Sequence, residues 1–457
     1  MGPIHTPRAS TPAPEDNEPW ANLPYHPGWG NNFRSESIPN SLPKQGHNPQ
    51  DPPYGLYTEG VTGSAFTAPR AKNKRSWLYR VRPSVVHEAY EPYEGNAGLI
   101  SDFSRHNPEI VVTPQQMRWD PFTVKGARGL DFVDSLRTIG GCGDCQNKDG
   151  IAYHFYEFGR DMEKRALYNA DGSWLFLPTK GELLLTTEFG KMHVPPGFLA
   201  VIPRSLKVTV SRVGDTANET ATGYVIENYR GNFELPELGP IGGNGLANLE
   251  DFETPRAAYE DADEEWTTIA KFGGSLWQYK QDHSPYDVVA WMGNYYPYRY
   301  DMNKFNTMGA LNYDHPDPSI SALLTVPTEQ PGTAAFDLLC FGPRWQAVSN
   351  TFRPQWFHRN IMPEFMVTIK GYPSPKDGAN LHNVSSAHGP SSDVTNAANT
   401  IPPGPMWVGD GGIICLMETY LPLNLTKWAL GDQLQKDYHR AMWQDIKRHH
   451  SLPAKSS

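Results

Sequence analysis

Residues 181–203 read GELLLTTEFGKMHVPPGFLAVIP and predict three short β-strands joined by tight turns. Apolar residues run in pieces of strand length, and Gly190 and the Pro-Pro-Gly triplet at 195–197 interrupt them. No piece has the length or the 3.6-residue period of a surface helix. This stretch therefore predicts an all-β fold of hairpins.

Similar apolar runs, bounded by turn residues, occur along much of the chain. They are IVVT at 110–113, WLFLP at 174–178, LKVTVSRV at 206–213 and TGYVIENY at 222–229. The 41 glycines and 42 prolines, about 18% of 457 residues against roughly 12% in average proteins, supply many turns. The spacing is typical of a β-sandwich or barrel, and the 181–203 pattern is similar to a cupin-type jelly roll. His193 is the single histidine of that pattern, which predicts a scaffold without a metal.

The chain divides into three predicted parts. Residues 1–27 are rich in Pro, Ala, Asp and Glu without an apolar period, and we expect a disordered tail. Residues 28–303 are expected to form an N-terminal β-domain that serves as metal-free scaffold and oligomerisation surface, and residues 304–457 a C-terminal β-domain. Fourfold spacing of Leu430, Leu434, Tyr438 and Met442 predicts a helix over 426–450. The predicted fold is thus all-β dominated, with two jelly-roll-like sandwiches and a C-terminal helix.

Composition and charge exclude several functional classes. A formal charge of -10 disfavours nucleic-acid or anionic-membrane binding, and no run of eighteen apolar residues predicts a membrane span. Four cysteines are too few to staple such a chain, so we expect a reducing, cytoplasmic compartment. Cys142 and Cys145 have CxxC spacing but lack the second pair that a zinc site needs, and their role stays open.

Metal-ligating side chains concentrate between 351 and 390, TFRPQWFHRNIMPEFMVTIKGYPSPKDGANLHNVSSAHGP. His358, Glu364, His382 and His388 lie within this segment. Two imidazoles and one carboxylate suit a non-haem Fe(II) that must keep one face open for substrate and O2. The even separation of His358 and Glu364 is compatible with one face of a strand, with a loop returning His388. By spacing alone, a histidine-rich loop that binds nothing is the commoner outcome.

The string HRNIMPEFM, followed by LHN and HGP, closely resembles the C-terminal motif of homogentisate 1,2-dioxygenases. Further strings resemble the same family in order and approximate spacing: GWGNNFRSES at 28–37, NPQDPPYGLYTEGVTGSAFTAPRAKNKRSWLYRVRPSV at 48–85, YNADGSWLFLPTKGELLLTTEFGKM at 168–192, FELPELGPIGGNGLAN at 233–248, SPYDVVAWMGNYYPYRYD at 284–301 and YDHPDPSI at 313–320. The resemblance covers almost the whole chain after the tail.

This resemblance implies roles residue by residue. It makes His358, Glu364 and His388 the ligands of Fe(II), His315 the acid/base beside the substrate hydroxyl, and His382 a pocket residue. It further implies O2 and a hydroquinone carboxylate as reactants, a maleylacetoacetate-type product, and a homo-oligomer that is a trimer or hexamer. On spacing alone, His315 between Asp314 and Pro316 is a surface-turn histidine.

The sequence departs from the family pattern around the expected substrate pocket. Where the family commonly has Gly-His-Tyr, this chain has Gly371-Tyr372-Pro373, and Tyr372 is the candidate replacement for the pocket tyrosine. Met292 replaces a histidine within AWMGN, Asn32 stands where an acidic residue is common, and the loop before LHN is shorter. These departures leave open a different substituted hydroquinone as substrate.

Two other functions remain as alternatives. A 2-oxoglutarate-dependent hydroxylase uses the same ligand types but spaces its first histidine and carboxylate two apart, whereas the spacing here is six. A non-catalytic cupin-like binding protein with a decayed iron site is the other alternative, and the complete ligand set argues against it.

Overall fold

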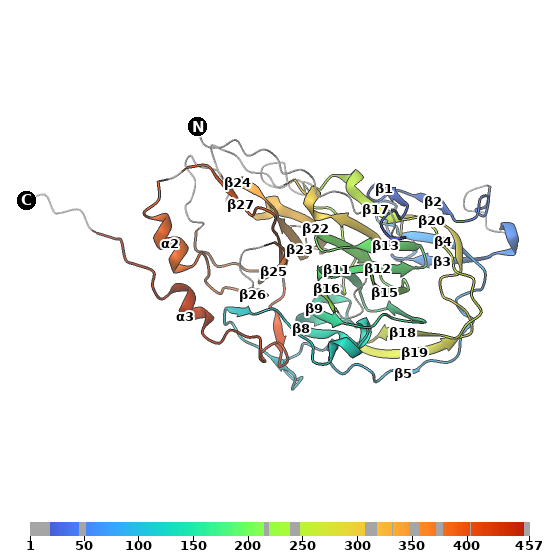
Figure 1. Ribbon diagram of the computed structural model, residues 1–457, viewed down its shortest axis with the longest axis horizontal. Helices are drawn as coiled ribbons and strands as arrows, with labels where there is room; N and C mark the ends of the chain where they lie inside the picture. The colour runs from blue at the N-terminus through green and yellow to red at the C-terminus, as the bar shows by residue number, and fades with distance from the viewer. Residues whose placement is uncertain are drawn as a thin grey trace, which may run out of the picture.

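The computed structural model describes residues 19–44, 52–213, 219–237, 247–306, 318–330, 332–346, 356–371, 378–402 and 404–451. Within these ranges the chain is mostly β-sheet, as Figure 1 shows. The α-helices are short: α1 (Phe132–Ser135), α2 (Ser392–Ala398) and α3 (Tyr438–Trp443). Single 3-10 turns add η1 (Pro53–Gly55), η2 (Ala127–Gly129), η3 (Leu249–Asp251), η4 (Met302–Lys304) and η5 (Pro318–Ser321).

A ten-stranded sheet forms the middle layer of the molecule. Its strands, in spatial order, are β1 (Tyr25–Pro27), β17 (Phe252–Pro255), β21 (Tyr298–Asp301), β14 (Phe198–Ile202), β11 (Ser173–Lys180), β16 (Ala221–Asn228), β9 (Asp149–Phe158), β8 (Arg137–Asp144), β29 (Asn424–Thr426) and β6 (Ile110–Val111).

A seven-stranded sheet covers one face of this middle layer. It consists of β13 (Gly190–Val194), β12 (Glu182–Thr187), β15 (Val208–Val213), β10 (Arg165–Asn169), β18 (Trp266–Phe272), β19 (Ser275–Gln281) and β5 (Glu91–Pro92). A four-stranded sheet lies beside it, with β2 (Phe33–Glu36), β20 (Val288–Gly293), β4 (Arg75–Arg80) and β3 (Tyr57–Thr62).

A six-stranded sheet covers the opposite face of the middle layer. It contains β22 (Ala322–Pro327), β23 (Ala334–Phe341), β28 (Ile413–Thr419), β25 (Glu364–Lys370), β26 (Ala379–His382) and β7 (Met117–Trp119). A two-stranded sheet of β24 (Arg344–Gln346) and β27 (Met406–Val408) lies at the same end of the molecule (Figure 1).

Alternation along β11 explains how one sheet serves two cores. Trp174 and Phe176 belong to the apolar cluster shared with the seven-stranded sheet, whereas Leu175 and Leu177 belong to the cluster shared with the six-stranded sheet. Successive side chains of a strand point to opposite faces, so a strand buried on both faces is apolar throughout. The run WLFL is continuous for this reason, and the fold is two β-sandwiches that share their middle sheet.

Two strands cross the predicted division at residue 303. β7 comes from the N-terminal part but pairs with β26, and β29 comes from the C-terminal part but pairs with β8 and β6. At the other end, residues 25–27 of the predicted tail form β1, which pairs with β17. The tail prediction therefore extends too far in this short stretch.

The seven strands expected from these apolar runs are all present, namely β6, β11, β12, β13, β14, β15 and β16. The helix expected over 426–450 is wrong for most of its length, because only α3 is helical there. The backbone of this segment bonds to residues 118–120 instead: Asp120 N–H donates to the Gln433 carbonyl and Gln435 N–H to the Arg118 carbonyl, both at 2.9 Å. Leu430 and Leu434 still pack on the large core, but through turns around Gly431.

Across the described ranges, no helix has both the length and the apolar character needed to cross a bilayer.

Candidate metal centre

Glu364 is the first residue of β25, on the face of the six-stranded sheet that points away from the middle layer. The next residue, Phe365, points the other way into the large core, where its ring lies 4.8 Å from that of Tyr153. The neighbours of Glu364 across the sheet are His382 on β26 and Glu418 on β28. Because cross-strand neighbours share a face, these residues form a polar row on the outer side of the sheet.

His358 and His388 reach Glu364 from two chain segments outside the strands. Their backbones form an isolated antiparallel bridge, in which His358 N–H donates to the His388 carbonyl at 2.9 Å and His388 N–H donates back at 3.1 Å. The ring centroids are 4.1 Å apart. The even spacing of His358 and Glu364 therefore does not reflect one strand face, since a bend over 361–362 separates the two residues.

The Glu364 carboxylate lies between the two imidazoles. Its Oε1 is 3.2 Å from His358 Nε2, and its Oε2 is 3.1 Å from His388 Nε2. One ligand atom from each of these three residues lies within 4.8 Å of the others, and they form the sole such group of His, Cys, Asp or Glu found in the described ranges. Three donors at this separation can close around one cation.

Backbone carbonyls orient both imidazole rings. His388 Nδ1 lies 2.9 Å from the Ser386 carbonyl oxygen, and His358 Nδ1 lies 3.5 Å from that of Trp356. Carbonyl and carboxylate oxygens both only accept, so each Nδ1 donates to its carbonyl and each Nε2 donates to Glu364; a cation that displaced the Nε2 proton would meet the Nε2 lone pair. This is the arrangement of metal-ligating histidines, whose other ring nitrogen donates to a fixed acceptor.

The charge state of the group also suits a cation. Burial would raise the pKa of Glu364, but the hydrogen bonds from His358 and His388 outweigh burial and hold this pKa at about 2. The hydrogen bond to Glu364 raises the pKa of His358 above its ordinary value. In the absence of a metal, protons thus occupy the place where a divalent cation would balance the carboxylate.

His382 lies beside the group but is not one of its three members. Its ring is stacked on that of His388, with centroids 4.1 Å apart and planes at 5°. Its Nε2 lies 3.2 Å from the Tyr438 hydroxyl of α3, and its buried Nδ1 has no hydrogen-bond partner among the residues that the structure describes. Burial lowers the pKa of His382 to about 3, so this ring is neutral near pH 7.

Three supporting residues were missed by sequence reasoning. The Asn360 amide donates to Glu364 Oε1, and its place in HRN was a usable signal because it lies two residues from a candidate ligand. Tyr438 stood out in the sequence for helical spacing alone. The Arg118 guanidinium lies 4.7 Å from the Tyr438 ring centre, and no local pattern links residues so far apart in the chain.

The sequence singled out three further residues around the expected substrate pocket. His315 and Tyr372 lie outside the described residues. Met292 is buried in a separate apolar cluster with Tyr79 and Val289, where its sulfur accepts from Arg34. This departure from the family pattern is therefore a packing change within the four-stranded sheet.

Comparison with known proteins identifies the family. The family model for the N-terminal part of homogentisate 1,2-dioxygenase matches residues 24–302, and the model for the C-terminal part matches residues 303–450. The chain belongs to the homogentisate 1,2-dioxygenase family. It is therefore a homogentisate 1,2-dioxygenase-like oxidoreductase.

The solved structures that are similar to this chain include the following three. Protein Ylba from E. coli has 8% identity and a TM-score of 0.27, over 74% of this chain and 96% of that chain. A cupin 2 conserved barrel domain protein from Leptotrichia buccalis has 6% identity and a TM-score of 0.25, over 62% and 88%. An oxalate decarboxylase from Bacillus subtilis has 10% identity and a TM-score of 0.25, over 78% and 90%.

The three candidate ligands of this dioxygenase-family chain are exposed to solvent to different degrees. The His358 side chain is 31% exposed, whereas those of Glu364 and His388 are 6% and 5% exposed. Among the described residues, the group is therefore most open to solvent on the side of His358. Three protein ligands with an open side are what a catalytic metal site requires.

Proposed function

We propose that the chain is an Fe(II)-dependent ring-cleaving dioxygenase that inserts both atoms of O2 into homogentisate or a closely related hydroquinone carboxylate. The product would be of the maleylacetoacetate type. The observation that carries this proposal is the convergence of two imidazole Nε2 atoms on one ionised carboxylate, His358, His388 and Glu364, in a member of this family.

The donor set fits ferrous iron. Two neutral imidazoles and one carboxylate are the facial ligand set of non-haem Fe(II) oxygenases. Fe(II) bound there would supply a Lewis acid for a phenolate oxygen and a redox partner for O2. The carboxylate and the Nδ1 contacts hold the ligands in place before any substrate arrives.

Residues beside the metal ligands are proposed to handle the substrate proton and to support the ligands. We propose that His315 removes the proton of the substrate hydroxyl, for which an imidazole of ordinary pKa near 6.5 is suited at neutral pH. The neutral, buried His382 ring supports His388 through face-to-face contact and excludes water from its far side. Tyr372 remains our candidate for a substrate-pocket hydroxyl.

An oxygen-uptake assay tests the proposed reaction. Protein purified under nitrogen and loaded with Fe(II) should consume one O2 for each homogentisate, and gentisate and ring-substituted homogentisates serve as competing substrates. Should a substituted homologue show the higher kcat/KM, the substrate assignment changes while the reaction class stands. Absence of uptake with every hydroquinone, despite full iron occupancy, would contradict the proposed function.

We also propose a homo-oligomeric assembly, a trimer or hexamer, in line with the family resemblance. Exposed aromatic residues on the two-stranded sheet support this, because Trp345 and Trp407 pack edge to face, with centroids 5.5 Å apart, and are 48% and 40% exposed. Sedimentation equilibrium should give about three or six times the 51.1 kDa chain mass. A monomer at micromolar concentration would contradict this assembly.

A further inference from the structure

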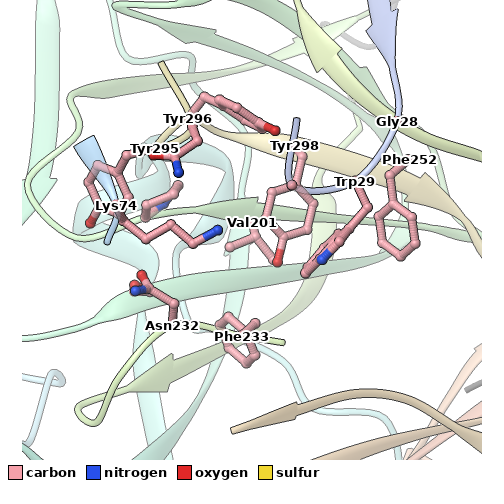
Figure 2. Close-up of a pocket in the computed structure, with 14 residues that line it drawn as sticks. Gly28, Trp29, Lys74, Val201, Asn232, Phe233, Phe252, Tyr295, Tyr296 and Tyr298 are labelled. Carbon is pink, nitrogen blue, oxygen red and sulfur yellow. The ribbon is translucent and has the colours of Figure 1, made fainter. Parts of the chain in front are cut away.

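A small pocket is lined by residues of the N-terminal part of the chain, none of which is a candidate metal ligand. All of its lining residues fall between Gly28 and Tyr298, whereas the candidate metal ligands lie between His358 and His388. Its free volume of about 50 Å³ is several times the roughly 10 to 15 Å³ that one water needs. Figure 2 shows aromatic rings on several sides of it.

Three hydrogen-bond donors of the pocket have no partner in the described part of the chain. The Tyr298 hydroxyl is buried and unpaired. The Lys74 ammonium and the Trp29 indole N–H likewise make no hydrogen bond or ion pair there. In Figure 2 the Lys74 amino group extends toward Tyr298, whose hydroxyl lies next to the Trp29 ring. A pocket that offers unpaired donors is complementary to a ligand that accepts.

The amides of the pocket are already engaged. Asn232 Nδ2 donates to the Gly63 carbonyl at 3.2 Å. Asn294 Nδ2 donates to the Asn73 carbonyl at 3.0 Å, and its Oδ1 accepts from Arg75 N–H at 2.9 Å. These contacts fix the walls and leave the three donors to the ligand.

The positive charge of Lys74 is not balanced within the pocket. No Asp or Glu is among the described residues that line it. The carboxylate that acts on the charge of Lys74, Glu234, forms an ion pair instead with Lys72, whose ammonium lies 2.6 Å from it. Partial burial lowers the pKa of Lys74, which reflects the cost of holding a cation away from water without a counter-ion. An anion in the pocket would remove this cost.

We propose that this pocket binds a small carboxylate, with the Lys74 ammonium as counter-ion and the Tyr298 hydroxyl and Trp29 indole N–H as further donors. A single cation suits a monoanion better than a doubly charged phosphate. The planar carboxylate and its short apolar tail would lie against the rings of Phe233 and Phe252, which also line the pocket. A water molecule would fill space but would not neutralise the ammonium.

Titration with sodium acetate tests this proposal, with sodium chloride of equal ionic strength as the reference. Ligand-observed NMR on the full-length protein should show saturable binding with a Kd on the order of 1 mM, as expected for so small a ligand. Acetamide, which has nearly the same shape but no charge, should bind at least about tenfold more weakly.

Variants locate the site. Lys74→Met should weaken acetate binding about 10- to 150-fold, the worth of one hydrogen bond to a charged group, and Tyr298→Phe about tenfold. Lys74→Arg should retain most of the affinity because it retains the charge. Lys280→Met is the matched control, since Lys280, on β19, is an exposed lysine paired with Glu265. Melting temperatures near that of the wild type establish that each variant is folded.

Several outcomes would overturn the proposal. They are non-saturable acetate binding, equal affinity for acetamide, or unchanged affinity in Lys74→Met. A carboxylate can also come from an Asp or Glu of a second copy of the chain. If acetate fails to bind and Lys74→Met instead alters the sedimentation coefficient, the pocket is part of a subunit contact and the small-ligand site is refuted.

Discussion

Glu364 is the anion among the three candidate ligands, and each of its oxygens faces a different imidazole. Glu364→Gln keeps the shape of the side chain but removes the charge that balances a cation. We expect a strong fall in bound iron, measured by elemental analysis of protein purified under nitrogen, with the fold retained by circular dichroism.

Glu182→Gln is the control for this variant. It disrupts another His–carboxylate contact, Glu182 with His193 at 2.7 Å, outside the metal centre. Iron content should not change in this control. Full iron occupancy in Glu364→Gln would remove Glu364 from the ligand set.

His315 is predicted to act on the substrate proton, not on the metal. His315→Asn should therefore keep its iron but lower kcat by about 10²- to 10⁴-fold, the usual contribution of a general acid/base. Stopped-flow turnover and iron analysis on the same sample separate the two roles. Loss of iron would instead make His315 a ligand.

Cys142 and Cys145 have the CxxC spacing of redox motifs, but the fold buries them in different clusters. All four cysteines are free and buried. Cys142 lies in the large core and Cys145 in a separate cluster with Phe103, and burial raises the pKa of each thiol to about 11. We expect negligible reaction of the native protein with a thiol reagent at neutral pH and full reaction in denaturant. Rapid labelling of Cys142 or Cys145 in the native state would show that this region opens.

Among the elements, β25 places Glu364 at its start and is followed directly by Gly371, whose backbone conformation favours glycine. Gly371 has a φ of +65°, and a Cβ there would lie 2.0 Å from the Gly411 carbonyl oxygen. We expect Gly371→Ala to lower the free energy of unfolding by more than the roughly 1 to 2 kcal/mol of the left-handed conformation alone. Chemical denaturation measures the difference.

Gly411→Ala separates the two costs. Gly411 has a similar φ of +70°, but its added Cβ would meet no atom within 4 Å. This variant should lose only the free energy of the left-handed conformation, without a steric clash. Equal destabilisation by the two substitutions would show that the contact with the Gly411 carbonyl relaxes freely.

At the scale of the whole molecule, the two sandwiches are interlocked. β29 supplies a strand to the middle sheet and β7 supplies one to the six-stranded sheet. A fragment of residues 1–303 would leave the β8 edge without β29 and expose the face of β11 that carries Leu175 and Leu177. We expect this fragment to melt well below the full chain or to aggregate, as followed by circular dichroism and light scattering.

A full-length chain that melts in one transition would agree with this interlocking. If the 1–303 fragment instead melted as cooperatively and at the same temperature as the full chain, the exchanged strands would be dispensable. The division at residue 303 would then also be a division in stability.

Several strands could be predicted from sequence because their signals are local, whereas the candidate ligands were assigned from the resemblance of one short segment to a family motif. His358, Glu364 and His388 lie in one short segment, and runs such as WLFLP carry the strand pattern in consecutive residues. The composition of the chain also predicted a turn-rich, all-β protein. Tertiary context did not need to be known for these features, since each depends on neighbouring residues.

Only the tertiary structure decided which distant segments meet. Fourfold apolar spacing after residue 426 predicted a long helix, but residues 433–435 use their backbone to bond to residues 118–120, and these pairings replaced most of that helix. The same folding brings Tyr438 onto His382 and Arg118 onto Tyr438. It also encloses Lys74, Tyr298 and Trp29 in one pocket. Local periodicity reports which face of a segment is apolar, whereas its partner is chosen by packing across the whole chain.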